Sequence, residues 1–298
     1  MGRYKPGLQK LKKARELFPQ KYGLTETIAN LYTLQGEYKA AGLEIQTLIE
    51  EKQPPPAKHM GYEGLRSLCV LLGRYRQAMQ ICEKEIELYW QEKDTTRIGI
   101  MHIRKALLRV YGWNDVVNAW EEIKNASIFE DKIFSAIFQT NLFDLYAYHG
   151  DYEMADSLLQ TGLLVIDSNR ALLHSIKGEC EEAEGYANVV LKSSEPWRKI
   201  FVLYPLAKCQ FEAGELDQAL NTALQIQKYC NSFSRFRALY YPKSLYLLGR
   251  IYEKMGRAVP ALQNYEKLLS LWNEADEDLP EPTDAKARFT ELKKMAGK

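Results

Sequence analysis

The chain has 298 residues, of which 46% are hydrophobic and 27% charged, and its 40 Lys and Arg against 39 Asp and Glu leave a formal charge of +1. This composition is typical of a folded globular protein and excludes a disordered tail or a membrane-embedded chain. The near-neutral charge also argues against nucleic acid as a partner. One round core is inefficient at this length, so we expect two domains or a core that grows by extension.

The N-terminal segment, residues 1–20, is predicted to be half of a helical hairpin, a turn followed by a single helix. An opening half hairpin leaves an apolar face uncovered. We therefore expect the chain to be excised from a larger protein, and we note that the uncovered face would allow self-association into a homo-oligomer. The segment lacks the apolar stretch of a signal peptide, which predicts a cytoplasmic protein without membrane insertion.

Glycines recur along the rest of the chain at separations of 28 to 42 residues and mark the ends of predicted helices. A glycine just past a helix adopts a left-handed backbone conformation at low cost, so the chain can reverse there. In six cases alanine stands five residues later, where a small side chain lets two helices cross closely. These signals predict turns at Gly36, Gly73, Gly112, Gly150, Gly178, Gly214 and Gly256.

Three places depart from this regular pattern. The proline-rich segment 51–60 is predicted to be an extended spacer between hairpins. The residue five after Gly112 is a valine instead of the usual alanine, and the 28-residue spacing before Gly178 predicts a short helix there. At the C-terminus a polar linker leads to a final helix, residues 283–296, which we expect to cap the stack with a solvated face.

Four segments around these glycines resemble tetratricopeptide repeats: LYTLQGEYKAA (31–41), LYAYHGDYEMA (145–155), CQFEAGELDQA (209–219) and LGRIYEKMGRAVPA (248–261). No strand pattern competes with this interpretation. The resemblance covers nearly the whole chain and implies an all-α fold. The expected architecture is a single right-handed superhelical solenoid over residues 1–298, with about 7.5 helix pairs and the capping helix.

The motifs of enzymes and metal sites are missing from the sequence. We find no glycine-rich phosphate loop, no HExxH, no paired Cys-x-x-Cys and no Gly-x-Ser-x-Gly. The sequence therefore predicts a protein that is not an enzyme and that needs no metal or cofactor. Its five cysteines are scattered without paired spacing, which predicts reduced thiols: Cys69, Cys82, Cys180, Cys209 and Cys230.

In tetratricopeptide repeats the first helix of each pair lines a concave groove that binds ligands. The resemblance implies that side chains ten, six, three and two residues before each turn glycine face this groove. In the N-terminal half these offsets select Asn30, Thr33, His102, Arg109, Thr140, Asp144 and Tyr148. In the C-terminal half, counting a further turn back for one of them, they select Tyr204, Lys208, Lys243, Tyr246, Arg250 and Glu253.

The C-terminal set has a chemistry of its own. Lys208 and Arg250 stand at equivalent positions of adjacent repeats, with Tyr204 and Tyr246 one turn earlier. Two cations and two aromatic rings in register predict a site for a carboxylate, a phosphate or an acidic peptide. The alternative is that Lys208 and Arg250 only solvate exposed helix faces.

The leading functional hypothesis is a scaffold or sensor module that binds a protein or peptide partner. The last sixth of the chain also resembles the closing repeats of bacterial signalling proteins, in which a kinase or transcription-regulator domain precedes the repeats. Two alternatives remain open at this point. The chain could be the small-molecule-sensing domain of a transcriptional regulator, or a module for self-association.

Overall fold

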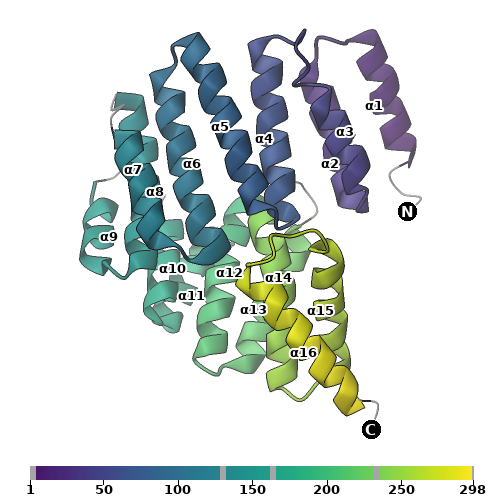
Figure 1. Ribbon diagram of the computed structural model, residues 1–298. Coiled ribbons are helices and arrows are strands. Elements are labelled where there is room, and N and C mark those ends of the chain that lie inside the picture. The colour runs from purple at the N-terminus through teal and green to yellow at the C-terminus, as the bar shows by residue number, and fades with distance from the viewer. Residues whose placement is uncertain (1–4, 128–131, 162–165, 231–234, 297–298) are drawn as a thin grey trace.

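The computed structural model describes residues 5–127, 132–161, 166–230 and 235–296, and every regular element in them is an α-helix (Figure 1). The predicted all-α fold is confirmed. No helix of these residues is long and apolar enough to cross a membrane. The side chain of Thr140 is outside the described residues. The helices are α1 (Lys5–Leu17), α2 (Tyr22–Gln35), α3 (Tyr38–Gln46), α4 (Pro55–Leu71), α5 (Tyr75–Glu92), α6 (Thr95–Trp113), α7 (Val116–Ser127), α8 (Lys132–His149), α9 (Tyr152–Leu159), α10 (Ile166–Lys177), α11 (Cys180–Val190), α12 (Pro196–Glu212), α13 (Leu216–Tyr229), α14 (Arg235–Lys254), α15 (Ala258–Leu271) and α16 (Pro280–Ala296).

These helices pack in consecutive pairs, each an even-numbered helix and the odd-numbered helix that follows it, from α2 with α3 to α14 with α15. α1 precedes the first pair and α16 follows the last. A continuous cluster of buried apolar side chains runs from Ala29 in α2 to Ala285 in α16. The core therefore grows by extension along a stack of helix pairs, because each pair buries its apolar face against its neighbours.

Six of the seven expected turns contain a glycine with φ between 72° and 89°: Gly36, Gly73, Gly150, Gly178, Gly214 and Gly256. At Gly36 the backbone N–H of Gly36 donates to the carbonyl O of Thr33 (3.2 Å), and that of Glu37 donates to Tyr32 (2.9 Å). These bonds satisfy the last carbonyls of α2 as the chain reverses. The alanine five residues after each of these glycines is completely buried, which allows the close crossing of the two helices.

The remaining turn lies at Asn114, two residues after the expected position. Gly112 is inside α6, where an added Cβ would lie 3.2 Å from the Tyr75 ring. Asn114 ends α6 with φ of 55°, a left-handed conformation that asparagine tolerates better than most residues. The expectation of a turn at Gly112 is therefore corrected. A shift of two residues moves a side chain to nearly the opposite side of a helix.

The stack curves until its last pairs lie beneath its earlier ones. In Figure 1, α4, α5, α6 and α8 form an upper row, α10 to α15 form a lower row, and α1 to α3 extend to one side. α14 packs directly against α4. Helices that are far apart in the sequence therefore share an interface between the two rows.

One edge of this interface, which we call the seam, joins turn residues 71–76 to loop residues 272–278. The indole Nε1–H of Trp272 donates to the carbonyl O of Leu71 (2.9 Å). The backbone N–H of Asp276 donates to the carbonyl O of Gly73 (3.0 Å). Gly73 allows this approach, since a Cβ there would be 2.7 Å from the Cβ of Ala275. Two ion pairs flank these contacts: Arg74 with Glu274, and Arg76 with Asp278.

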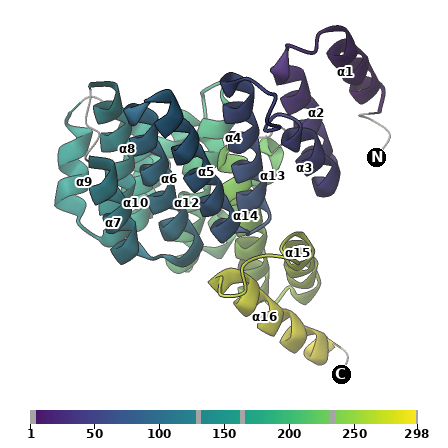
Figure 2. The same cartoon turned by 45° about the horizontal axis from the view of Figure 1, so that its top comes forward.

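The C-terminal helix α16 begins at Pro280, three residues before the expected start of the capping helix. Proline suits the first turn of a helix, because the N–H that it lacks would have no helical partner there. α16 lies beside α15 at the outer end of the stack (Figure 2). Most of its side chains are exposed, whereas Ala285 is completely buried.

A disulfide joins Cys180, the first residue of α11, to Cys209 in α12, with their Cα atoms 5.7 Å apart. The prediction of five reduced thiols was therefore wrong for this pair. The two cysteines are 29 residues apart and belong to no motif, so the sequence carried no signal for the bond. The other three thiols are buried, and burial raises their pKa to about 12 at Cys69 and about 11 at Cys82 and Cys230.

We expect reduction of the disulfide to lower the free energy of unfolding by about 2–4 kcal/mol, because the bond restricts the unfolded chain. Urea unfolding at pH 7 with and without a phosphine reductant measures this loss. A variant with Cys180→Ser and Cys209→Ser should be less stable and should not respond to the reductant. An unchanged wild-type unfolding curve after reduction would contradict the prediction.

Gly73→Ala and Gly256→Ala test the seam as a matched pair. The two glycines have nearly the same φ, 73° and 72°, so each substitution adds about 1–2 kcal/mol of backbone strain. Only at Gly73 does the new Cβ meet another segment, since nothing lies within 4 Å at Gly256. We expect Gly73→Ala to lower the free energy of unfolding by about 1–3 kcal/mol more than Gly256→Ala in urea titrations. Equal losses would show that the seam loop does not pack on Gly73.

Candidate functional site

Four tyrosines meet where the upper and lower rows of helices join, and we call them the tyrosine cluster. Tyr111 and Tyr148 come from the last turns of α6 and α8, whereas Tyr204 and Tyr240 come from α12 and α14. Tyr204 stacks on Tyr240 with ring centroids 5.0 Å apart. Tyr111 lies edge-on to Tyr148 and to Tyr240, at 5.8 Å and 6.5 Å. The rings thus fill the space between the two rows.

Asp144 of α8 is buried beside the tyrosine cluster and accepts a hydrogen bond from the Tyr111 hydroxyl (3.0 Å). Burial raises the pKa of Tyr111 well above its ordinary value, and the nearby Asp144 charge raises it further. Burial likewise raises the pKa of Tyr204 and Tyr240. These phenols therefore stay neutral around pH 7 and pack as aromatic side chains with a polar tip.

Three residues expected along the ligand groove, Asp144, Tyr148 and Tyr204, are brought together in this way. Tyr111 and Tyr240, which complete the cluster, were not expected from the sequence. Because the rings pack on one another across the rows, this part of the concave side is an internal contact of the protein.

Four more expected groove residues lie on α14 and contact α16. The Nζ of Lys243 pairs with Glu281, and the Tyr246 hydroxyl donates to Asp284 (2.6 Å). The remaining two pairs are Arg250 with Asp284 (3.7 Å) and Glu253 with Arg288 (3.0 Å).

Lys208 has a different environment from Arg250, although the two stand at equivalent positions. Its side chain is 54% exposed and lies 3.7 Å from Glu212 on the same helix. The Arg250 guanidinium, in contrast, faces Asp284 and lies over the Phe211 ring, 5.6 Å from its centroid. The two cations therefore do not form one open site.

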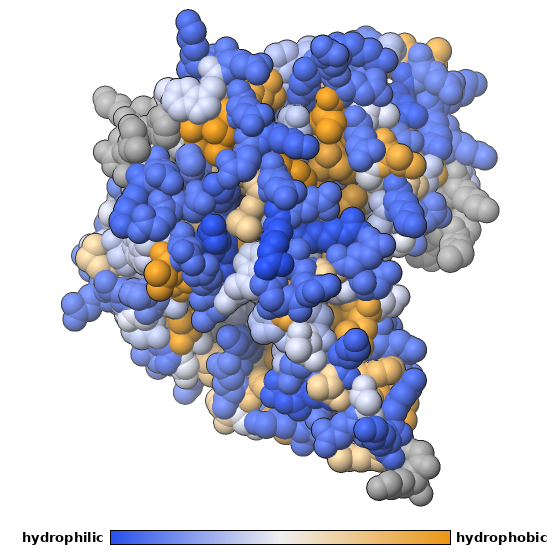
Figure 3. Space-filling view, viewed as in Figure 1, coloured by the Kyte–Doolittle hydropathy of each residue, from blue (hydrophilic) through white to orange (hydrophobic). Residues whose placement is uncertain are grey.

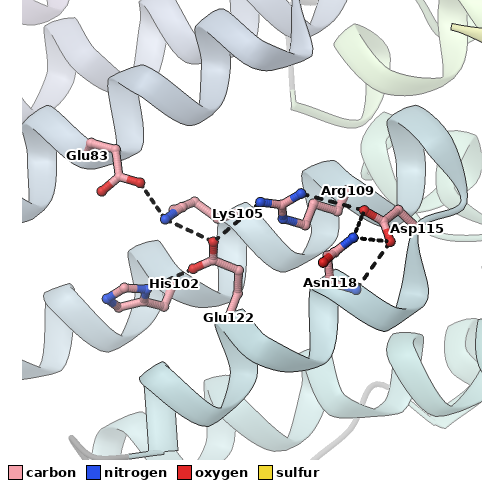
Figure 4. A network of polar contacts seen from close by, with 7 residues as sticks. All are labelled: Glu83, His102, Lys105, Arg109, Asp115, Asn118 and Glu122. Carbon is pink, nitrogen blue, oxygen red and sulfur yellow. Dashed lines mark hydrogen bonds and ion pairs between the residues drawn. The ribbon is translucent and has the colours of Figure 1, made fainter. Parts of the chain in front are cut away.

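Glu122 of α7 is the centre of a charged network between α5, α6 and α7 (Figure 4). Its carboxylate lies 2.9 Å from the Nζ of Lys105 and 3.0 Å from the Nδ1 of His102. Lys105 also pairs with Glu83 of α5, and the Arg109 guanidinium lies 4.0 Å from Glu122. The network neutralises a buried carboxylate and a buried ammonium while it joins three helices.

His102 and Arg109 belong to this network because the turn of their hairpin is at Asn114. They were expected in the groove because they stand ten and three residues before Gly112. Counted from Asn114, the same offsets select Arg104 and Tyr111 instead. His102 and Arg109 therefore contact α7, the second helix of their own pair, through Glu122.

The corrected register reveals a row of charged side chains on α2, α4 and α6. Glu26, Glu63 and Arg104 each stand ten residues before their turn residue. Burial raises the pKa of Glu26, and the charge of Glu63 raises it further. A guanidinium nitrogen of Arg104 lies 3.8 Å from a Glu63 oxygen. We call these three residues the acidic row, and Asn30 lies one turn after Glu26 on α2.

The described residues can be compared with the requirements of a metal site and of a reactive thiol. Among them, no group of three or more His, Cys, Asp and Glu side chains is placed to hold a metal ion. The three thiols outside the disulfide are buried and hold raised pKa values, so they are poor nucleophiles. The arrangement is suited to contacts between polar surfaces.

No family model and no curated protein matches the chain. Among solved structures, the chain is similar to a tetratricopeptide repeat protein from Parabacteroides merdae ATCC 43184, with a TM-score of 0.50 and 14% identity. That match covers 92% of this chain and 99% of the other. The chain has the tetratricopeptide repeat fold. A second similar structure is the P58(IPK) TPR domain, with 14% identity and a TM-score of 0.32 over 100% of this chain and 86% of that one.

This tetratricopeptide repeat solenoid should depend on the Glu122 network. We expect Glu122→Gln to lower the free energy of unfolding by about 2–4 kcal/mol at pH 7, because Lys105 is buried and loses one of two carboxylate partners. In the matched control Glu121→Gln, the affected pair with Lys124 is exposed, so we expect a change below about 0.5 kcal/mol. Urea unfolding measures both.

The free energy of unfolding of wild type and of Glu122→Gln should depend differently on pH. Burial alone would raise the pKa of Glu122, but hydrogen bonds from His102 and Lys105 outweigh it and lower the pKa below the ordinary 4.5. A lowered pKa stabilises the fold fully above the unfolded value, and this contribution is lost as pH falls through the folded value. The stability gap between wild type and Glu122→Gln should therefore be largest at pH 7 and shrink below about pH 4. A gap that does not shrink as the pH is lowered from 7 through the acidic range would contradict this assignment.

Proposed function

We propose that the chain is a non-enzymatic scaffold that binds a protein or peptide partner along the concave side of α2, α4 and α6. The acidic row is the observation that carries this proposal. Its three charged side chains come from the first helices of three successive repeats, α2, α4 and α6. Asn30 is placed to donate to or accept from a backbone at the same surface.

The charge of this surface favours a basic partner segment. The charge of Glu63 disfavours the charged form of Glu26, and among the described residues an ion pair is present only at Glu63, with Arg104. An acidic partner was the expectation from the cations near the C-terminus, but Lys243 and Arg250 pair with carboxylates of α16. A Lys or Arg of a partner would relieve the repulsion between Glu26 and Glu63.

Polar recognition also fits the visible surface. Figure 3 shows mostly hydrophilic residues on the face of the molecule that is viewed in Figure 1, with apolar side chains in separate patches. The large exposed apolar side chains belong to different helices, such as Leu43 on α3, Val117 on α7 and Val259 on α15. Scattered apolar residues are ordinary for a protein surface, so they supply no interface by themselves.

We place this scaffold in a signalling protein on the resemblance of its last repeats alone. The disulfide between Cys180 and Cys209 favours an oxidising compartment over the cytoplasm. A bacterial periplasmic or extracellular sensor region satisfies both considerations.

Selection of peptides from a displayed random library against the full chain tests the proposed function. We expect basic peptides to be enriched, and we expect Glu26→Lys with Glu63→Lys to weaken their binding at least about tenfold, a loss of about 1.4 kcal/mol. The control Glu184→Lys with Glu266→Lys makes the same change of charge at exposed residues of α11 and α15. Fluorescence anisotropy with the selected peptides gives the affinities. Equal binding to the two double variants would contradict the proposal.

A further inference from the structure

A second candidate interaction surface lies on α14, under α16. Lys243, Tyr246, Arg250 and Glu253 follow one another at spacings of three and four residues, so they share one face of α14. We call these four residues the α14 face. Each of them contacts a charged side chain of α16, as described above.

The contacts between the two helices follow a simple order. Lys243, near the start of the α14 face, pairs with Glu281 near the start of α16. Glu253, ten residues later on α14, pairs with Arg288, seven residues later on α16. The two helices therefore run in the same direction, as first helices of successive repeats do. α16 thus occupies the place of the next first helix and presents an acid, an acid and a base at positions i, i+3 and i+7.

Asp284 is the central contact of this arrangement. It accepts hydrogen bonds from the Tyr246 hydroxyl (2.6 Å) and from Nε of Arg288 (2.6 Å), and the Arg250 guanidinium lies 3.7 Å away. The Tyr246 hydroxyl in turn accepts from Arg250 (2.8 Å). Cation, phenol and carboxylate therefore meet as they would around an acidic ligand.

α16 has both apolar and polar contacts with the rest of the stack. Only Ala285 of its helical residues is completely buried, while Phe289 and Leu292 are half-buried against the core. Its ion pairs near the surface, such as Asp284 with a side chain 37% exposed, contribute about 0–1 kcal/mol each. The polar contacts give α16 its position more than its binding strength.

The fit of α16 is also incomplete. Oε1 of Glu281 pairs with Lys243, but Oε2 is buried with no hydrogen-bond partner among the described residues. A buried carboxylate oxygen without a donor costs free energy.

We propose that the α14 face is a docking site for a charged helix, that α16 occupies it within the chain, and that a partner helix with the same acid-acid-base spacing displaces α16. The partner is thus a protein helix with carboxylates at i and i+3 and a basic residue at i+7. This surface is separate from the acidic row, so the two can fail independently.

A labelled peptide with the sequence of residues 278–296 tests the proposal on the full chain. In the release variant, Glu281→Lys with Asp284→Lys, α16 is repelled by Lys243 and Arg250, which leaves the α14 face open. We expect saturable fluorescence anisotropy with the release variant, at least about tenfold tighter than with wild type. Glu291→Lys, at an exposed residue of α16, is the control and should behave as wild type.

Two further arms define the site. Lys243→Glu with Arg250→Glu, added to the release variant, should abolish peptide binding, as should a peptide in which Glu281 and Asp284 are replaced by Lys. Glu26→Lys with Glu63→Lys, added to the release variant, should leave peptide binding unchanged. A folded release variant that does not bind the peptide, or wild type that binds it equally well, overturns the proposal.

Hydrogen exchange on the wild-type chain keeps the proposal testable if the release variant does not fold. We expect amides around Asp284 and Arg288, in the middle of α16, to exchange at least about 100-fold faster than those in the middle of α15, because α16 opens without the rest. Equal protection of the two helices would show that α16 is a fixed cap and would overturn the proposal.

Discussion

The absence of a side chain at Gly73 allows the backbone of an early turn to lie directly against the loop that follows α15. Trp272 and Ala275 pack on this glycine, and Trp272 donates a hydrogen bond to Leu71 across it. The seam keeps the lower row of helices beneath the upper row. A stack of helix pairs has no intrinsic reason to stop curving at this point, so the contact fixes where the superhelix closes.

Closure at the seam divides the concave side into two parts. Where the rows meet, Tyr204 and Tyr240 of the lower row fill the space beside Tyr111 and Tyr148 of the upper row. The acidic row lies elsewhere, on α2, α4 and α6. The tyrosines, which in an open solenoid would line a groove, thus pack against the core, and the partner binding that we propose uses the remaining polar surface.

Local signals in the sequence predicted the helix pairs, but they did not predict that the lower row of helices packs against the upper row at the seam. Glycines with left-handed backbone and alanines at the crossings act within about 40 residues, so their spacing carries the information. The seam joins residues about 200 apart, and it depends on small rotations that accumulate over several pairs. The disulfide escaped prediction for a similar reason, because Cys180 and Cys209 become neighbours only when α11 packs on α12.

The candidate site was predicted as well as the register allowed. The turn residue after α6 is Asn114 and not a glycine. Counting from Gly112 therefore assigned His102 and Arg109 to the groove face incorrectly. Counting from Asn114 selects Arg104 instead.

On α14 the count selected side chains that do bind carboxylates, but the carboxylates belong to α16. Charge pattern alone cannot tell a partner's acid from an acid of the same chain, because both satisfy a cation equally well. Because an acid of a partner and an acid of α16 can pair with the same cation, a partner helix and α16 would compete for the α14 face.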